Sequence, residues 1–357
     1  MSRPRIAVCG WIGSSNLGDE LIAEQVAELL LDEGGDPTLV TIDTSRAPSD
    51  RTTIRHAGAL DTIGLLRELR HHDGLVFGGG GLLQDETGPL NIPFHLTRLA
   101  AGRLLRLPWA CVGLGVGDVR RRSGQALTWL VARGFVAASV RDADSVSRYR
   151  TLTGLEPELG IDPVLALPPR SVEPTSHLVV SLRPMNRPDQ RRLSTQDGPA
   201  ESQISRWAEA IGRVAAATGL TVRFISWDDA YDHAIHEAVA DLLDVPYELE
   251  QPNAREVIDR IGTGRIVISM RYHGAVSAVV TGRPTLVLDY SPKMAALVDE
   301  VGPGLRVLHP EAPADDLVTA AHALLDDPAP TGVPDATERA AVNRAVVRRL
   351  LHAASER

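Results

Sequence analysis

The sequence is poor in cysteine, with two among its 357 residues. Cys9 and Cys111 lie inside the apolar runs IAVCG and PWACVGLG, where a thiol usually serves as a small buried hydrophobic group. Two cysteines in a chain of this length do not make a disulfide scaffold, and no CxxC or HExxH spacing indicates a metal site. We therefore expect neither a disulfide framework nor a bound metal.

Positive charge is also in deficit, because 37 Lys and Arg residues stand against 46 Asp and Glu residues, for a net charge of -9. Nucleic acid and anionic lipid both require a surface with an excess of Lys and Arg, so neither is expected as a general partner. Any anionic ligand must be bound by a local group of positive side chains.

Long hydrophobic runs are missing as well. No 18 consecutive residues are apolar, and the N-terminal sequence MSRPRIAVCG leads into a strand-like segment without the apolar core of a signal peptide. We expect a cytoplasmic protein with no integral membrane segment. The composition gives no indication of an oligomeric state.

What the sequence does contain is an alternation of short apolar runs with longer segments of helical period, which is typical of parallel βα units. The strands predicted in the first half are residues 5–9, 38–42, 74–77, 109–114 and 136–141. Those predicted in the second half are residues 177–183, 221–226, 265–269 and 285–288. The sequence therefore predicts an α/β protein built from Rossmann-like, doubly wound sheets.

A chain of this length, with 43% hydrophobic residues, is sufficient for two ordinary cores. Prolines are concentrated in DPVLALPPRSVEPTS, where they disfavour a helix and indicate a linker. We predict an N-terminal domain over residues 1–165, a linker over 166–176 and a second domain over 177–330. Residues 331–357 form a charged helix with an apolar stripe, predicted to pack back on the N-terminal domain.

Ligands of such sheets bind at the carboxyl ends of the strands. With two doubly wound domains facing each other across a cleft, we expect the active site between them. The polar stretch 186–200 has no periodicity and is predicted to be a long loop of the kind that serves as a lid.

The first strand ends in GWIGSSNLGDELI, a glycine-bearing turn that leads into a helix. Backbone N–H groups in such a turn can approach a ligand, and the helix N-terminus favours negative charge. Asn16, Asp19 and Glu20 are the candidate side chains here. The alternative is that Asn16 or Asp19 caps the helix and Glu20 only complements its dipole.

The third predicted strand runs into GGGGLLQDETG, residues 78–88. Four consecutive glycines favour neither helix nor strand, and indicate an unusual backbone or a close approach to a ligand. Gly79, Gly80, Gln84 and Asp85 are the candidate binding residues. A glycine-rich turn with a solvated acidic rim is the alternative.

Positive side chains follow several other predicted strands. Arg141 lies in SVRDADS, where the alternative to ligand binding is an ion pair with Asp142. In the second half, Arg183 follows a strand in SLRP, and Arg271 follows another in SMRYHG. The guanidinium fork suits phosphate and carboxylate because it donates to two oxygens at once.

Two further candidates are His273 in SMRYHG and Lys293 in LDYSPKM. A helix dipole disfavours the protonated form of a histidine at its N-terminus unless a bound anion compensates. His273 as a polar cap and Lys293 as a solvent-facing side chain are the alternatives.

Taken in order, SSNLGDELI, GGGGLLQD, SVRDADS, RYHGAVSAVVTGRP and DYSPKM resemble the motifs of the polysaccharide pyruvyl transferase family. The resemblance extends from Gly10 to about Val301. It implies two Rossmann-like domains of the GT-B type. It also implies transfer of the enolpyruvyl group of phosphoenolpyruvate to a sugar hydroxyl pair, which forms a pyruvate ketal and releases phosphate without a cofactor.

The resemblance also implies roles for individual residues. Arg271 and His273, in the Arg-x-His motif, belong to the phosphoenolpyruvate site, with Arg141 and Lys293 as further anion-binding candidates. The acceptor or acid/base side comprises Asp19, Glu20, Gln84 and Asp85. Gly274, where many members carry Ala, and Ser14–Ser15 depart from the family pattern and bear on acceptor identity.

A ketal-forming mechanism needs one acid and one base. We expect His273 to protonate C3 of the enol and Asp19 or Glu20 to deprotonate the attacking hydroxyl. Arginines, including Arg183, would stabilise the departing phosphate. The acceptor is expected to be a sugar or glycan, and a lipid-linked acceptor would be met at the inner face of the membrane.

Two other functions fit the same motifs. The first is a GT-B glycosyltransferase, in which the arginines hold the diphosphate of a nucleotide sugar. The second is a non-catalytic binding protein that keeps the fold without turnover. Donor choice and phosphate release distinguish them.

Overall fold

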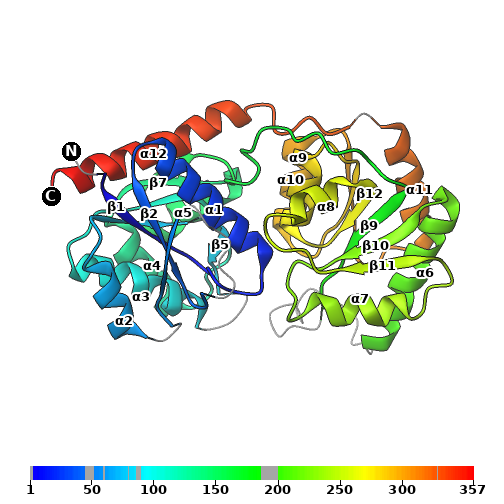
Figure 1. Ribbon diagram of the computed structural model, residues 1–357, viewed down its shortest axis with the longest axis horizontal. Coiled ribbons are helices and arrows are strands. Elements are labelled where there is room, and N and C mark those ends of the chain that lie inside the picture. The colour runs from blue at the N-terminus through cyan, green and yellow to red at the C-terminus, as the bar shows by residue number, and fades with distance from the viewer. Residues whose placement is uncertain are drawn as a thin grey trace. The chain divides into compact units, whose positions relative to one another are not determined.

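The computed structural model describes residues 3–44, 52–58, 61–78, 80–85, 90–185, 200–327 and 329–357 (Figure 1). The chain forms two compact units. Unit 1 consists of Met1–Ser14, Asp19–Ala166 and Asp335–Arg357, and unit 2 of Ser15–Gly18 and Leu167–Pro334. Each unit has its own parallel sheet, so the predicted α/β class with two parallel-sheet domains is confirmed.

The sheet of unit 1 has the order β3-β2-β1-β4-β6-β7-β8, with β5 paired to β6. Its strands are β1 (Arg5–Cys9), β2 (Asp36–Thr41), β3 (Thr53–His56), β4 (Gly74–Phe77), β5 (Gly80–Leu83), β6 (Trp109–Val116), β7 (Phe135–Val140) and β8 (Glu158–Leu159). Its helices are α1 (Leu17–Asp32), α2 (Thr62–Leu69), α3 (Asn91–Leu104), α4 (Arg122–Ala132), α5 (Ala143–Thr153) and α12 (Ala336–Ser355).

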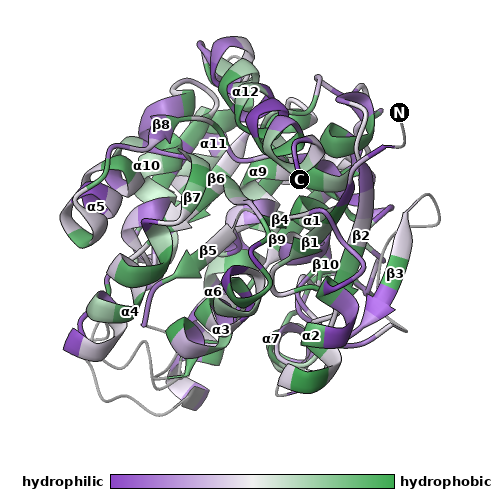
Figure 2. Ribbon diagram, turned by 90° about the vertical axis from the view of Figure 1, so that its left-hand side faces the viewer, coloured by the Kyte–Doolittle hydropathy of each residue, from purple (hydrophilic) through white to green (hydrophobic). Residues whose placement is uncertain are grey.

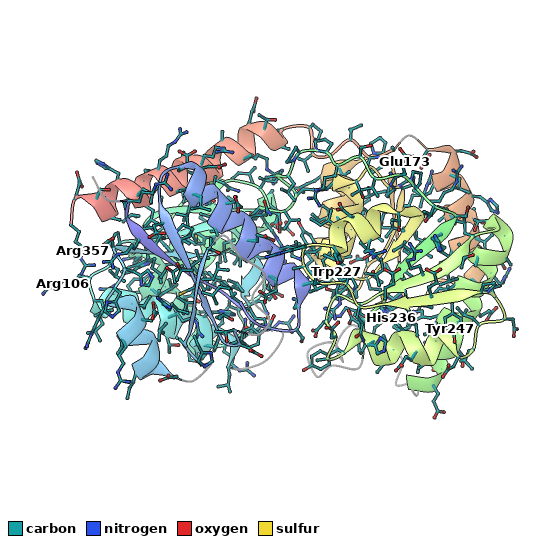
Figure 3. All side chains as sticks on the ribbon, viewed as in Figure 1. Arg106, Glu173, Trp227, His236, Tyr247 and Arg357 are labelled. Carbon is teal, nitrogen blue, oxygen red and sulfur yellow. The ribbon has the colours of Figure 1, made fainter. Side chains whose placement is uncertain are left out.

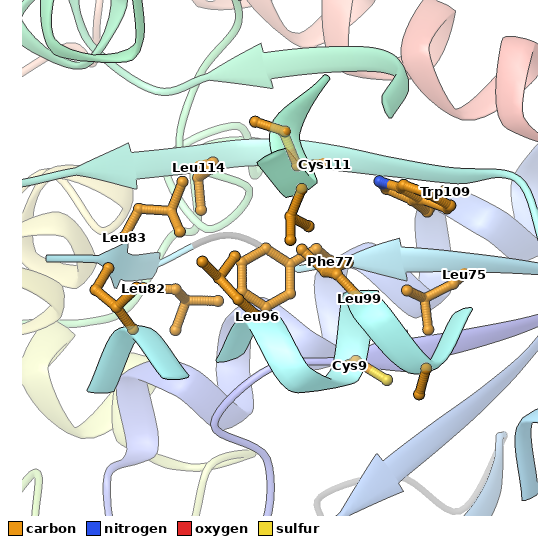
Figure 4. Packing of buried hydrophobic residues seen from close by; sticks show 14 of the residues in the cluster. Cys9, Leu75, Phe77, Leu82, Leu83, Leu96, Leu99, Trp109, Cys111 and Leu114 are labelled. Carbon is orange, nitrogen blue, oxygen red and sulfur yellow. The ribbon is translucent and has the colours of Figure 1, made fainter. Parts of the chain in front are cut away.

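The core of unit 1 lies between the central strands and the helices that cover them. Phe77 at the end of β4 lies among Leu82, Leu96 and Leu99, as Figure 4 shows. Cys9 is fully buried in the same cluster, and burial raises the pKa of its thiol to about 12. Such a thiol stays protonated, as expected for a small hydrophobic core residue.

The helix α12 belongs to unit 1, although it follows all of unit 2 in the sequence. Hydropathy alternates along it (Figure 2). Asn343 accepts a hydrogen bond from Ser139 Oγ (2.8 Å) and donates one to the carbonyl of Ile161 (2.8 Å). Arg339 Nε donates to the carbonyl of Gly160 (2.7 Å). These buried bonds fasten α12 to the end of β7 and to the segment that follows β8.

The sheet of unit 2 has the order β11-β10-β9-β12-β13-β14. Its strands are β9 (His177–Ser181), β10 (Thr221–Ile225), β11 (Tyr247–Glu250), β12 (Gly264–Ser269), β13 (Thr285–Leu288) and β14 (Leu305–Leu308). Its helices are α6 (Ala200–Thr218), α7 (Asp232–Ala240), α8 (Val257–Gly262), α9 (Tyr272–Val280), α10 (Pro292–Val301) and α11 (Ala314–Asp326). Of the stretch predicted to be a lid, residues 186–199 lie outside the described residues.

Strand order defines one special position in each sheet. In unit 1, β1 has β2 on one side and β4 on the other, so the chain adds strands first on one side of β1 and then on the other. In unit 2, β9 stands in the same way between β10 and β12. Ligands of doubly wound sheets bind at such switch points, outside the carboxyl ends of the strands. The fold thus indicates two candidate ligand-binding positions, at the carboxyl ends of β1 and β4 and of β9 and β12.

The run of four glycines, residues 78–81, leads into a strand. The prediction that these glycines favour neither helix nor strand is therefore wrong for Gly80 and Gly81, which lie in β5. Gly80 begins β5, where it pairs with Leu114 of β6 and has φ +100°. Backbone pairing to an established strand supplies the energy that the missing side chains do not, while the positive φ still requires glycine. Gly79 lies outside the described residues.

Candidate functional site

Three positive side chains gather at the switch point of unit 2. Arg183 follows β9, Arg271 follows β12, and Lys293 lies in the first turn of α10. The guanidinium carbon of Arg183 lies 4.3 Å from the ring centroid of Tyr290, and Nζ of Lys293 lies 5.5 Å from the same centroid. We call Arg183, Arg271 and Lys293 the cationic cluster.

The phenol of Tyr290 reports the field of this cluster. Burial alone would raise its pKa, but the charges of Arg183, Lys293 and Arg271, with a hydrogen bond to Lys293, lower the pKa to about 7. A negative charge is therefore strongly favoured at this point. Tyr290 lies with Lys293 in the segment LDYSPKM, but the effect of the three cations on its phenol was not predicted from the sequence.

Buried carboxylates hold Arg271 in place. Nε of Arg271 donates to Asp232 Oδ2 (2.8 Å), Nη2 donates to Asp232 Oδ1, and Nη2 lies 3.8 Å from Asp228 Oδ2. Asp232 is fully buried and also accepts hydrogen bonds from the amides of Trp227 and Asp228. Burial disfavours the charge of Arg271, but the carboxylates outweigh it and raise the pKa. Arg271 is thus a fixed, permanent cation.

A buried histidine supports the same strand ends. His236 accepts a hydrogen bond from the amide of Leu182 through Nε2 (2.9 Å), and its Nδ1 lies 3.3 Å from Ser226 Oγ. Burial lowers the pKa of His236 to about 3, so the ring is neutral. Figure 3 labels His236 and Trp227 in unit 2. Trp227 begins the segment WDDAYDH after β10, and His236 follows that segment. Its acidic residues, which include Asp228 and Asp232, stand at a strand end and were a signal that the sequence reasoning missed.

Aromatic rings and a glycine turn surround His273. Trp227 stacks on its ring at 6.4 Å with an interplanar angle of 30°, and Tyr272 meets it edge-on at 5.3 Å. A Cβ on Gly18 would lie 2.2 Å from Nδ1 of His273, so the turn approaches the ring as only glycine permits. At Gly274, a Cβ would lie 2.4 Å from the hydroxyl oxygen of Ser269.

Asn16 shapes the turn that lies against His273. Its Oδ1 accepts a hydrogen bond from the amide of Gly18 (3.1 Å), and its backbone forms a bridge with Asp228. The next amide, of Leu17, donates to the carbonyl of Trp227 (2.8 Å). Asn16 thus holds its turn against unit 2, to which Ser15–Gly18 belong.

Asp19 and Glu20 are adjacent in sequence but differ in surroundings. Glu20 is 2% exposed, and its Oε1 accepts hydrogen bonds from the amides of Gly13 (2.6 Å) and Ser14 (3.1 Å). It therefore holds the loop after β1. Asp19 is half-buried, and its Oδ1 lies 3.1 Å from the position of a Cβ on Gly80. Asp19 and the glycine run are thus brought together at the β1/β4 switch point.

Gln84 and Asp85 have contacts within unit 1. The backbone carbonyl of Gln84 accepts a hydrogen bond from Asn91 (2.7 Å) at the start of α3. Asp85 Oδ2 accepts from the amides of Arg120 (3.0 Å) and Arg121 (2.8 Å), ahead of α4. These bonds order the connections around β5, and acceptor binding by either side chain stays a prediction.

Arg141 lies in a buried network of charges, with 5% of its surface exposed. It donates to Asp142 through Nε (3.2 Å) and to Asp162 through Nη1 (3.3 Å). Its guanidinium carbon would lie 2.9 Å from a Cβ on Gly115, which explains a glycine in GLGVG. The ion pair weighed as the alternative for Arg141 is present, together with a second carboxylate. Its role in anion binding stays a prediction.

Two classes of site have no support in the described part of the chain. No cluster of three or more His, Cys, Asp or Glu side chains there has the geometry to hold a metal ion. Among the described helices, none is long and apolar enough to cross a membrane.

The two parallel-sheet units define an α/β protein of the GT-B fold class. UDP-GlcNAc 2-epimerase from Neisseria meningitidis, bound to UDP-GlcNAc, has a TM-score of 0.62 and 11% identity, covering 98% of this chain and 99% of that one. The S. aureus MnaA–UDP co-structure has a TM-score of 0.61 and 13% identity, covering 94% of both chains. Identities this low establish the fold alone.

The family is given by the sequence. The chain belongs to the polysaccharide pyruvyl transferase family, whose sequence profile, described as Polysaccharide pyruvyl transferase, matches residues 16–292. The resemblance predicted from the motifs is thereby confirmed. No curated protein matches the sequence.

Proposed function

We propose that the protein transfers the enolpyruvyl group of phosphoenolpyruvate to two hydroxyls of a sugar or glycan, forming a pyruvate ketal and releasing phosphate. The observation that carries this proposal is the cationic cluster at the β9/β12 switch point. Phosphoenolpyruvate bears a carboxylate and a phosphate, and the cluster lowers the pKa of Tyr290 because it favours negative charge. Family membership supports the choice of group transferred.

The donor would bind through charge and through fixed geometry. Arg271 is oriented by Asp232, so little reorganisation accompanies binding of an anion. Arg183 and Lys293 supply the remaining charge from two other strand ends. A bound anion takes the place of the phenolate charge of Tyr290. The phenol then stays protonated and can donate a hydrogen bond to that anion.

The reaction requires one addition to C2 of the enol, with protonation of C3, and then one substitution at C2. One acceptor hydroxyl attacks C2 while C3 gains a proton and becomes a methyl group. The second hydroxyl then displaces phosphate from C2 and completes the ketal, and its proton passes to the departing phosphate. We assign His273 as the acid and Asp19 as the base, because the carboxylate of Glu20 binds the loop amides.

The test is the shift in thermal denaturation midpoint (Tm) on adding phosphoenolpyruvate or UDP-GlcNAc, followed by phosphate release with acceptor glycans. A ligand that binds the folded state raises Tm by mass action. We expect phosphoenolpyruvate to raise Tm, and Arg271→Ala to abolish that rise. Because Arg271→Ala leaves Asp232 buried without its partner, Lys293→Met is the second variant. Arg306→Ala, at an exposed ion pair with Asp327, is the matched control.

The outcomes separate the functions weighed from the sequence. Stabilisation by UDP-GlcNAc alone would overturn the donor assignment and favour glycosyl transfer. Stabilisation by phosphoenolpyruvate without phosphate release, across lipid-linked and free glycans, would make the protein a binding protein. A rise in Tm that survives in both Arg271→Ala and Lys293→Met would remove the cationic cluster from the donor site.

A further inference from the structure

Unit 1 contains an arginine that is buried without a counter-ion. Arg98 of α3 is 2% exposed. Within the described ranges, no carboxylate forms an ion pair with it, and its Nε has no hydrogen-bond partner. Burial lowers its pKa, and the one group among those residues that opposes this effect is Cys9, whose thiol stays protonated at neutral pH. A buried guanidinium without a paired carboxylate costs stability unless a ligand supplies the opposite charge.

Aromatic rings surround Arg98. Its guanidinium carbon lies 3.9 Å from the ring centroid of Phe94, one turn earlier in α3. Phe94 meets Trp11 edge-on at 4.8 Å and His95 edge-on at 4.9 Å. Trp11 is 37% exposed, in a sequence with only 4% aromatic residues. An exposed tryptophan therefore forms the outer part of a group whose inner part is a buried cation.

The group lies at the carboxyl edge of the sheet of unit 1. Trp11 follows β1, and His95 packs against Phe77 at the end of β4, with ring centroids 5.6 Å apart. Between parallel strands, α3 runs back from the carboxyl edge, and helical side chains lean toward the helix N-terminus. Arg98 lies back over Phe94 in that direction. The group thus occupies the β1/β4 switch point, where such folds bind ligands.

His95 adds a neutral polar group at the same point. It is 1% exposed, and its Nδ1 has no hydrogen-bond partner in the part of the chain that the structure describes. Burial and the charge of Arg98 lower its pKa to about 3, so the imidazole is neutral. Such a ring can exchange a hydrogen bond with a hydroxyl but does not compete with Arg98 for an anion.

We propose that Trp11, His95 and Arg98 bind an acceptor sugar that carries an anionic group, a carboxylate or a phosphate. Trp11 lies against the apolar face of the sugar ring, His95 bonds a hydroxyl, and Arg98 pairs with the anion. This inference rests on the proposed function, because it specifies the class of acceptor. It also adds a second anion site to the chain, distinct from the cationic cluster of unit 2.

The experiment measures Tm against concentration for four probes: methyl glucoside, methyl glucuronide, glucose 1-phosphate and inorganic phosphate. We expect the two charged sugars to raise Tm more than methyl glucoside or phosphate alone. The apparent affinities for methyl glucuronide and glucose 1-phosphate then show whether a carboxylate or a phosphate is preferred. Arg98→Met should weaken their apparent affinity about tenfold or more, since a hydrogen bond to a charged group is lost. Without ligand its Tm should equal or exceed that of the wild type, because an unpaired buried charge has been removed.

A matched pair elsewhere in unit 1 provides the controls. Arg133 lies 4.1 Å over the ring of Trp129, which is 44% exposed, on α4. Trp129→Ala and Arg133→Met should leave the shifts unchanged, whereas Trp11→Ala should weaken binding of both charged sugars.

Three results would overturn the proposal. They are no shift with either charged sugar, equal shifts in wild type and Arg98→Met, and loss of the phosphoenolpyruvate shift in Arg98→Met, which would place Arg98 in the donor site. The phosphoenolpyruvate shift itself, dependent on Arg271, tests the proposed function separately. The acceptor inference and the donor assignment can therefore fail independently.

Discussion

Among single residues, Tyr290 allows the sharpest prediction because its ionisation reports the cationic cluster directly. Its pKa in the folded protein is about 7, against an ordinary value of 10.0. The folded state therefore ionises first as pH rises. Stabilisation by the phenolate is absent below pH 7, grows between pH 7 and pH 10, and is fully present above pH 10.

The measurement is a comparison of wild type and Tyr290→Phe across that interval. The stability of wild type relative to Tyr290→Phe should rise from pH 7 to pH 10, and a tyrosinate absorbance step near pH 7 should vanish in the variant. Phosphoenolpyruvate should bind the wild type less tightly above pH 7, since its anion competes with the phenolate. Parallel pH profiles for the two proteins would contradict this account of the cluster.

Another residue, Gly18, sets the position of His273. In Gly18→Ala, the new Cβ would overlap the imidazole and displace it. Turnover should fall by about tenfold or more because the acid is misplaced, while phosphoenolpyruvate binding persists. Gly212→Ala is the control, since a Cβ there meets its nearest neighbour at an ordinary 3.5 Å. Steady-state phosphate release distinguishes the two, and unchanged turnover in Gly18→Ala would exclude His273 as the acid.

At the scale of elements, α12 should stabilise unit 1 through the buried hydrogen bonds of Asn343. Asn343→Ala leaves the Ser139 hydroxyl without an acceptor and the carbonyl of Ile161 without its donor, which should cost about 1–3 kcal/mol. Arg344→Ala removes an exposed arginine from its ion pair with Glu33, which keeps Arg348 as a partner, and should cost at most about 1 kcal/mol. Urea denaturation of both variants measures the difference. Equal losses would mean that α12 is held by its apolar contacts alone.

The elements also show which parts of the fold the sequence could reveal. Central strands such as β1, β4 and β13 have the predicted bounds, because continuous burial requires continuous apolar runs. The strands β11 (YELE) and β14 (LRVL) were not predicted. Both are edge strands in which charged residues interrupt the apolar ones, and their strand state comes from pairing with β10 and β13.

The candidate site was predictable to a similar extent. Cations after strand ends are visible in sequence, because parallel topology brings strand ends together, and Arg183, Arg271 and Lys293 were found in this way. The focus of their charge on Tyr290 depends on side-chain positions that no spacing encodes. The same holds for Arg98, which in sequence is one more arginine on an amphipathic helix.

On the scale of the whole molecule, the two sheets repeat one arrangement with different chemistry. The switch point of unit 2 carries several cations and aromatic rings, with carboxylates behind them. That of unit 1 carries Asp19 and, beneath Trp11, one buried cation. In a chain with a net charge of -9, each sheet thus has positive charge at its switch point, where doubly wound folds bind ligands.

The path of the chain between units has a consequence for hydrogen exchange. Leu17 and Gly18 begin α1 but belong to unit 2, whereas the helix from Asp19 onward belongs to unit 1. The amide of Leu17 is protected by the carbonyl of Trp227, so its exchange should follow the opening of unit 2. Amides only one turn further along α1 should instead exchange with unit 1. A single helix would then report the local stability of two different cores.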